Sequence, residues 1–136
     1  MLLKNKRILY IEDDDRNRRL VEMVLASEGA QVWFEKWGLP AMTLSAVINH
    51  MPLDVILLDL MFRHGFSGYD IFEALRHQPE LSGVPVVIVS AADPSIEMPK
   101  ARDLGIPNYI AKPIDATVFP RQIHNIIEGQ SVWHAQ

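Results

Sequence analysis

The chain has 136 residues, of which 49% are hydrophobic, and this suits one domain with a sizeable core. Its formal net charge is −4 and its 13 basic residues are scattered, so it lacks the basic patch of a protein that binds nucleic acid directly. The absence of cysteine excludes disulfides and thiolate metal sites, and no apolar run reaches the roughly 20 residues of a membrane span, so we expect a cytoplasmic protein without membrane contact.

Five short apolar runs rich in β-branched residues are separated by segments with helical periodicity. The runs predict strands at residues 7–11, 31–35, 54–59, 85–90 and 108–112. Helices are predicted at about 16–28, 40–50, 69–77 and 116–128, with one more before the last strand. Because strands and helices alternate strictly, we expect an α/β fold, a doubly wound, flavodoxin-like (βα)5 domain. Its parallel five-stranded sheet would have the strand order 2-1-3-4-5.

The segment "ADPSIEMPKARDLG" allows two interpretations of the remaining helix. Asp93 could cap a helix with Pro94 in its first position, but Pro99 would then lie inside the helix and remove a backbone hydrogen bond. The alternative is a shorter helix with Pro99 in its first turn. We favour the shorter helix.

The segment "ILYIEDDD" leads from a predicted strand into four consecutive acidic residues, Glu12 to Asp15. One interpretation is a solvated loop that opens a helix, since acidic side chains cap free N–H groups and oppose the helix dipole. That role needs one or two acids. The other is a site for a divalent cation, whose charge makes neighbouring carboxylates tolerable. The acidic run by itself leaves both interpretations open.

Polar side chains also end the later strands: Asp59 ends the third, Ser90 the fourth and Lys112 the fifth. In a flavodoxin-like order the first and third strands are neighbours, so Glu12, Asp13 and Asp59 should converge in one acidic pocket. Ser90 and Lys112 should lie at its rim. This oxygen-rich set, without His or Cys at ligand spacing, favours Mg²⁺ over Zn²⁺.

A magnesium site with few protein ligands indicates phosphoryl transfer, because the ion keeps room for a phosphate oxygen. We expect Asp59 to be the nucleophile that attacks phosphorus. Lys112 would pair with the phosphoryl oxygens, and the Ser90 hydroxyl would donate a hydrogen bond to one of them.

Four segments together resemble the receiver domain of bacterial two-component response regulators, over the chain up to about residue 128. "ILYIEDD" resembles the family's first strand and acidic pair, and "VILLDLM" the strand of the phosphoacceptor, here Asp59. "VVIVSA" resembles the strand with a conserved hydroxyl at Ser90, and "YIAKPI" the Lys112–Pro113 step, whose peptide bond is cis in the family. The chain ends soon after the last helix, so the resemblance is to stand-alone, CheY-like members.

The resemblance implies that Asp59 receives a phosphoryl group from a phosphohistidine on a sensor histidine kinase or a histidine phosphotransfer protein. It also implies that Asp13, Asp59 and the backbone carbonyl of Met61 bind Mg²⁺, with Glu12 acting through water. Such a domain is not an enzyme in the ordinary sense, since it catalyses only its own phosphorylation and dephosphorylation.

Ser90 and Tyr109 match the family's switch pair, in which the hydroxyl moves to the phosphate and the aromatic ring turns inward behind it. The match implies a changed surface on the fourth helix, fifth strand and fifth helix. An unknown downstream protein, or a second copy of the chain in a homodimer, would bind that surface. Arg16, Arg18 and Arg19 are expected to form a solvated helix face, beside which the family's kinases dock.

Three functions compete. A phosphoaccepting receiver is favoured. An unphosphorylated receiver-like interaction module is the alternative, supported weakly by Arg63 in place of a usual proline and by one additional residue before Gly68. A phosphohydrolase ranks last, because Met61 stands where such enzymes carry a second acid. Residues 1–129 are expected to form the receiver domain and residues 130–136 a loose C-terminal tail, with no effector domain after it.

Overall fold

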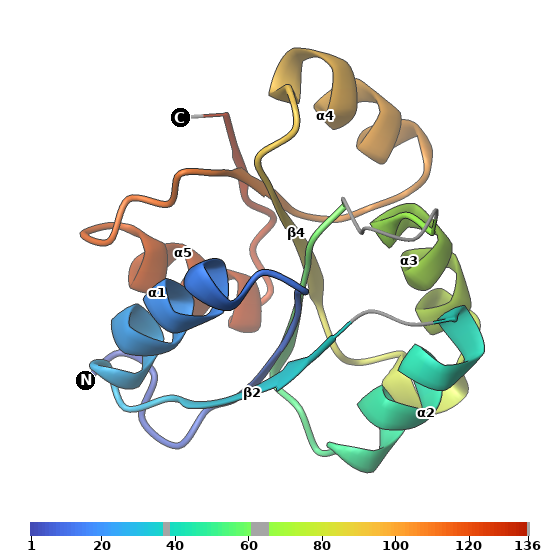
Figure 1. The fold of residues 1–136 in the computed structure, drawn as a ribbon. Helices are drawn as coiled ribbons and strands as arrows, with labels where there is room; N and C mark the ends of the chain where they lie inside the picture. The colour runs from blue at the N-terminus through green and yellow to red at the C-terminus, as the bar shows by residue number, and fades with distance from the viewer. Residues whose placement is uncertain (37–38, 61–65, 136) are drawn as a thin grey trace.

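The structure is a computed structural model that describes residues 1–36, 39–60 and 66–135. It has a parallel sheet in the order β2-β1-β3-β4-β5-β6 (Figure 1). The strands are β1 (Arg7–Ile11), β2 (Gln31–Glu35), β3 (Val55–Leu58), β4 (Val86–Ser90), β5 (Tyr109–Ala111) and β6 (Trp133–His134). The helices are α1 (Asp15–Ala26), α2 (Pro40–Asn49), α3 (Gly68–Arg76), α4 (Pro94–Asp103), α5 (Phe119–Ile127) and the short 3-10 helix η1 (Pro79–Leu81). The predicted flavodoxin-like fold is confirmed.

Helices cover both faces of the sheet, with α1 and α5 on one face and α2, α3 and α4 on the other (Figure 1). Alternate side chains of β1 enter the two cores: Ile8 and Tyr10 pack beneath α1 and α5, and Leu9 and Ile11 beneath the other helices. All four are fully buried. Burying an aliphatic side chain of this size contributes roughly 1.5–3 kcal/mol relative to exposure. The two cores therefore hold the strand ends in fixed positions.

The sheet has one strand more than predicted. Residues expected to be a loose tail form β6, which pairs in parallel with β5. The Ser131 hydroxyl donates to the Pro107 carbonyl at 2.6 Å, and the Asn108 side-chain oxygen accepts from the Val132 N–H at 2.8 Å. The sequence analysis missed this strand because its two residues are too few for a period-2 pattern.

The prediction of a shortened fourth helix was wrong. α4 runs continuously from Pro94, with Pro99 inside it. Asp93 caps it, since its Oδ1 accepts from the Ser95 N–H at 3.0 Å and from the Ser95 hydroxyl at 2.8 Å. Ala101, two residues after Pro99, is fully buried. The cap and this packing outweigh the single backbone hydrogen bond that Pro99 removes.

The last helix starts later than predicted. α5 begins at Phe119, whereas the sequence pattern placed its start at Ala116. Asp115 instead holds a turn, because its Oδ1 accepts from the N–H and the hydroxyl of Thr117. Pro120 has no N–H and fits without loss only in a first turn, which fixes the later start. Among the described residues, none of the helices combines the length and apolar character that crossing a membrane requires.

Candidate functional site

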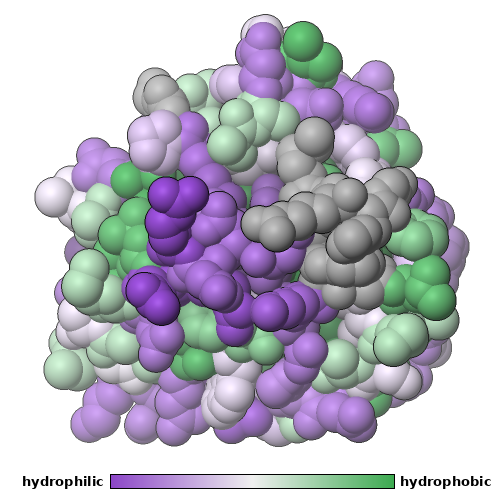
Figure 2. Space-filling view, viewed as in Figure 1, coloured by the Kyte–Doolittle hydropathy of each residue, from purple (hydrophilic) through white to green (hydrophobic). Residues whose placement is uncertain are grey.

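The carboxyl ends of β1 and β3 lie side by side. Ile11 is in register with Leu58, so the next residues, Glu12 and Asp59, emerge at the same edge of the sheet. Backbone hydrogen bonds fix the positions of both residues. The Glu12 N–H donates to the Glu35 carbonyl at 3.0 Å, and the Asp59 N–H donates to the Ile11 carbonyl at 3.1 Å. Figure 2 shows hydrophilic side chains gathered in the middle of the face seen in Figure 1.

Three carboxylates meet at this edge. Glu12, Asp13 and Asp59 each offer one oxygen atom, and these atoms lie within 4.8 Å of one another. Glu12 is 1% exposed and Asp59 6%, so water screens their repulsion poorly. Lys112 supplies one positive charge, with its Nζ 2.7 Å from Glu12 Oε2 and 3.8 Å from Asp59 Oδ2. Among the described residues, these three carboxylates and one ammonium leave a formal excess of two negative charges, which matches a divalent cation.

The other two acids of the run serve α1. Asp14 is the N-cap: its Oδ1 accepts from the Arg16 N–H at 2.8 Å and from the Asn17 N–H at 3.4 Å. The bond from Arg16, more than any other contact, lowers the pKa of Asp14. Asp15 pairs with Arg18 at 2.9 Å. Both interpretations of the acidic run are therefore supported, each for different residues.

The arginines of α1 do not form one solvated face. Arg16 and Arg19 are exposed, as predicted, but Arg18 is half-buried. Its guanidinium carbon lies 4.8 Å from the centroid of the Phe34 ring. A planar cation over an aromatic ring gains attraction while covering apolar surface, and this explains why Arg18 turns inward.

Glu12 is held by several donors. The Lys112 ammonium and the Tyr10 hydroxyl both donate to Oε2, at 2.7 Å and 2.9 Å, and the Asp14 N–H donates to Oε1 at 3.2 Å. Burial disfavours the charged carboxylate, but the Lys112 ammonium, with help from Tyr10, outweighs it and keeps the pKa of Glu12 below its ordinary value. Glu12 therefore contributes a full negative charge at neutral pH. Sequence analysis missed Tyr10, which looks like an ordinary core residue of a strand.

Tyr10→Phe is expected to lower the free energy of unfolding at pH 7 by about 1–3 kcal/mol, because a buried carboxylate loses a hydrogen bond. The lowered pKa of Glu12 means that this bond stabilises the fold above the ordinary Glu pKa, and that the stabilisation disappears as pH falls through the lower folded value. The decrease in the free energy of unfolding caused by Tyr10→Phe should therefore be smaller at pH 4 than at pH 7. Urea denaturation at both pH values measures it.

Tyr69→Phe is the matched control for this prediction. The Tyr69 hydroxyl donates to Glu97 Oε2 at 2.6 Å, but Glu97 is only half-buried, so water can replace the lost donor. The control should lose less stability at pH 7. Equal losses for both variants at both pH values would contradict the role assigned to Tyr10.

Asp59 lies directly under the start of α3. Its Oδ1 accepts from the Leu60 N–H at 2.8 Å, and the Gly68 N–H donates to the Leu60 carbonyl at 2.9 Å. A Cβ at Gly68 would lie 2.2 Å from the Asp59 backbone oxygen. Only glycine permits this approach. Sequence analysis did not identify Gly68 as a site residue; its only signal was a glycine before a helical pattern.

Gly68→Ala is expected to lower the free energy of unfolding by about 3 kcal/mol, because the added methyl group meets backbone atoms that cannot move aside cheaply. Thermal or urea denaturation measures the change. Gly83→Ala is the control, since a Cβ there meets nothing within 4 Å. A Gly68→Ala protein as stable as the Gly83→Ala protein would show that the close approach of Gly68 to Asp59 is relieved more easily than this contact indicates.

Ser90 and Lys112, predicted to lie at the rim of the site, stand at the ends of β4 and β5. Ser90, fully buried at the end of β4, accepts the Ala92 N–H on its Oγ at 3.1 Å. The Lys112 N–H donates to the Ser90 carbonyl at 2.7 Å, which brings the end of β5 to the same edge. The Lys112–Pro113 peptide bond is cis, as the resemblance implies.

Tyr109, the second residue of the predicted switch pair, is fully buried in β5. Burial raises the pKa of Tyr109, and the nearby Ser90 hydroxyl offsets part of the increase. In a five-stranded order β5 would be an edge strand, but β6 covers that edge here. The switch itself stays a prediction. Two further predictions, the Met61 carbonyl as a ligand and the altered loop at Arg63, lie outside the described residues.

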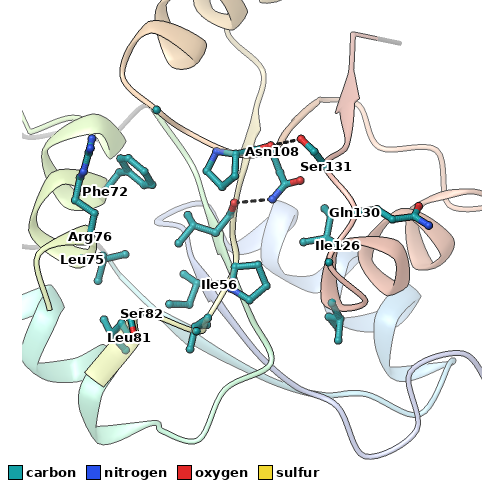
Figure 3. A pocket seen from close by; sticks show the side chains of 18 residues that line it. Ile56, Phe72, Leu75, Arg76, Leu81, Ser82, Asn108, Ile126, Gln130 and Ser131 are labelled. Carbon is teal, nitrogen blue, oxygen red and sulfur yellow. Dashed lines mark hydrogen bonds between the residues drawn. The ribbon is translucent and has the colours of Figure 1, made fainter. Parts of the chain in front are cut away.

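A cavity of about 530 Å³ lies at the amino ends of the strands, near the first residues of β3, β4 and β5 (Figure 3). Two of its polar side chains already have partners: Arg76 donates to the Leu104 carbonyl at 2.7 Å, and the Asn108 amide donates to the Val86 carbonyl at 3.2 Å. The acidic cluster is at the other end of the strands, so this cavity is separate from the candidate site.

Residues 8–124 match the family model of the response regulator receiver domain. The chain belongs to this family. Receiver domains are the phosphoaccepting modules of two-component systems, and histidine kinases or phosphotransfer proteins phosphorylate them. The converging carboxylates and lysine occupy the strand ends at which the sequence resemblance placed them.

Curated relatives agree with this membership. Response regulator PleD of Caulobacter vibrioides is 29% identical over 120 residues, covering 88% of this chain and 26% of PleD. Transcriptional regulatory protein CseB of Streptomyces avermitilis is 29% identical over 126 residues, covering 93% of this chain and 51% of CseB. The chain spans about a quarter to a half of the length of the curated relatives it matches.

Solved receiver structures share the fold. A sensor protein from Polaromonas sp. JS666 superposes with a TM-score of 0.75 at 26% identity, covering 90% of this chain and 96% of that one. The receiver domain of a sensor histidine kinase from Pseudomonas aeruginosa, with a magnesium ion coordinated in its active site cleft, has a TM-score of 0.76 at 22% identity, covering 92% and 99%. Chemotaxis protein CheY4 of Vibrio cholerae has a TM-score of 0.75 at 17% identity, covering 90% and 98%.

Proposed function

We propose that this receiver domain takes a phosphoryl group on Asp59 from a phosphohistidine of a sensor histidine kinase or a histidine phosphotransfer protein. The observation that carries the proposal is the convergence of three carboxylates within 4.8 Å beside the Lys112 ammonium. Asp59 is the acid that directly follows β3, in the place of the family's phosphoacceptor. Family membership supports the phosphoaccepting role, and the local geometry supports this residue.

Glu12, Asp13 and Asp59 would hold Mg²⁺, and the resemblance to the family adds the Met61 carbonyl. The fit rests on hard oxygen donors and on the formal excess of two negative charges that the described side chains Glu12, Asp13, Asp59 and Lys112 give. When bound, the ion would offset the repulsion between the carboxylates and an incoming phosphoryl group.

The transfer forms one bond and breaks one. A carboxylate oxygen of Asp59 bonds to phosphorus while the phosphorus–nitrogen bond of the donor breaks, and the electron pair of that bond goes to the imidazole. The Lys112 ammonium pairs with charge on the phosphoryl oxygens, and the Ser90 hydroxyl donates to one of them. The domain thus catalyses a reaction on its own side chain.

The output is a protein-binding surface formed by α4, β5 and α5. Ser90 moves toward the phosphoryl group and Tyr109 fills the space behind it, which shifts the balance between two arrangements of this surface. A downstream protein or a second copy of the chain would bind the favoured arrangement.

The first test is the intact mass of the protein after incubation with acetyl phosphate. A single phosphoryl adduct is expected with Mg²⁺, and none with a chelator, because the carboxylates repel the donor when the cation is removed. An adduct of equal yield in chelator would contradict the proposed role of the metal. Absence of an adduct under every condition would favour an unphosphorylated receiver-like interaction module.

A further inference from the structure

The C-terminal segment of this chain is built onto the edge of the sheet beside the proposed switch residue. β6 pairs with β5 so that Trp133 lies opposite Tyr109 and His134 opposite Ile110. The Tyr109 N–H donates to the Val132 carbonyl at 2.9 Å. The backbone of β5 that would otherwise form the edge of the output surface is therefore covered by the chain's own residues.

Side-chain hydrogen bonds anchor the segment. Asn108 is 3% exposed, and its amide group joins two strands: it donates to the Val86 carbonyl at 3.2 Å and accepts from the Val132 N–H at 2.8 Å. The Ser131 hydroxyl donates to the Pro107 carbonyl at 2.6 Å (Figure 3). A buried side chain with both its donor and its acceptor used fixes the register of the strand that it holds.

Trp133 contacts Tyr109, the proposed switch residue, directly. Its ring stacks on the Tyr109 ring, with centroids 6.2 Å apart and planes 9° from parallel. The Arg102 guanidinium carbon, from α4, lies 4.5 Å from the Trp133 ring centroid. The Trp133 indole N–H donates to the Ser131 hydroxyl at 3.1 Å, which fixes the ring's orientation. The stack therefore links β6, β5 and α4, elements of the proposed output surface.

The buried position of Tyr109 needs such support. The Tyr109 hydroxyl is buried, and the nearby Ser90 hydroxyl compensates only part of the cost of burying it among the described residues. A buried polar group with incomplete hydrogen bonding disfavours the arrangement that contains it. Stacking against the Trp133 ring, which Arg102 and Ser131 hold in place, offsets that cost.

We propose that Trp133 is a positioning residue for the phosphoryl reaction: it holds Tyr109 in the buried position, and docking of β6 is thereby coupled to occupation of the Asp59 site. The inference rests on the proposed function, in which the buried ring accompanies the phosphorylated state. Coupling is reciprocal, so a phosphoryl group at Asp59 should also tighten the docking of β6. The C-terminal segment then carries the state of the site to whatever binds this edge.

The test compares the affinity of variants for beryllium fluoride, a phosphoryl analogue, by calorimetry at saturating Mg²⁺. Trp133→Ala is expected to weaken binding roughly 2- to 10-fold, the factor that corresponds to one aromatic pair. Trp133→Phe keeps a ring for stacking and should stay within about 2-fold of the unmodified protein. His134→Ala, which removes the neighbouring β6 side chain, should bind as the unmodified protein does. The Mg²⁺ affinity should be the same in all of them.

Hydrogen exchange tests the proposal in the unmodified protein, so the result does not depend on how a substitution affects folding. The Tyr109 amide, which bonds to Val132, should exchange more slowly with beryllium fluoride bound than with Mg²⁺ alone. Unchanged exchange, equal affinity of Trp133→Ala and the unmodified protein, or Trp133→Phe as weak as Trp133→Ala would each overturn the proposal. If the protein takes up neither the analogue nor a phosphoryl group, the proposed function fails with it; uptake without these differences overturns the role of Trp133 alone.

Discussion

Asp59→Asn should remove the phosphoryl adduct formed with acetyl phosphate and Mg²⁺, reducing its rate of formation by about 10³-fold or more. An amide oxygen is a poor nucleophile for phosphorus, whereas the side chain keeps its size and can still accept the Leu60 N–H that Asp59 Oδ1 accepts at 2.8 Å. Intact mass spectrometry over time measures the rate.

The same variant should remain folded without the metal. Three carboxylates lie within 4.8 Å of one another, so removing one charge relieves repulsion, and the variant should be at least as stable as the unmodified protein in chelator. Asp103→Asn, at the exposed end of α4, is the control and should be phosphorylated normally. An adduct of undiminished yield on folded Asp59→Asn protein would place the phosphoacceptor elsewhere.

Lys112→Met is expected to lower both the phosphorylation rate and the stability. Methionine keeps most of the stem, but the cation that lies 2.7 Å from Glu12 and 3.8 Å from Asp59 is lost. Phosphorylation by acetyl phosphate should slow by about 10²-fold or more, because developing charge on the phosphoryl oxygens loses its partner. Breaking a buried ion pair should also lower the free energy of unfolding by about 3–5 kcal/mol at pH 7 in chelator.

The stability loss of Lys112→Met should depend on pH and on Mg²⁺. In the unmodified protein the pKa of Glu12 is lowered, so its pair with Lys112 stabilises the fold above about pH 4.3, the ordinary Glu pKa, and this contribution is lost as pH falls through the folded value. The difference between the two proteins should therefore shrink toward pH 4. Added Mg²⁺ should restore part of the loss at pH 7, since it replaces the missing charge.

Urea denaturation at both pH values, with chelator or Mg²⁺, measures these effects. Lys100→Met is the control: Lys100 is exposed, with its Nζ 5.0 Å from the Tyr69 ring centroid, and its loss should have little effect. A loss for Lys112→Met that matches the control, or that is the same at pH 4 and pH 7, would contradict the assigned role of the Glu12–Lys112 pair.

The sequence by itself determined the order of the first five strands and the charged and hydroxyl side chains of the site. Continuous apolar strands alternating with helices can be buried only in a parallel sheet with helices on both faces, and the carboxyl ends of such strands meet at one edge. Polar residues placed just after the strands must then converge. Glu12, Asp13, Asp59, Ser90 and Lys112 could be identified in this way, because local pattern and strand order suffice to bring them together.

Contacts between residues distant in the chain decided the rest. The continuity of α4 through Pro99 depends on the burial of Ala101 against the core, which no local propensity reports. The need for glycine at Gly68 arises from a backbone oxygen that belongs to Asp59, on another element. In each case a tertiary contact outweighs or adds to a preference that is read within a few residues.

β6 is the clearest element that local sequence could not predict. Its two residues carry no periodic pattern, and it exists because Asn108, twenty-four positions before Val132, holds its backbone. Trp133 was a tail residue in the sequence and is a partner of Tyr109 in the structure. Local sequence thus defined which groups could carry the chemistry, and only the folded chain showed what holds them in position, because packing and hydrogen bonding between distant segments are set by the sheet as a whole.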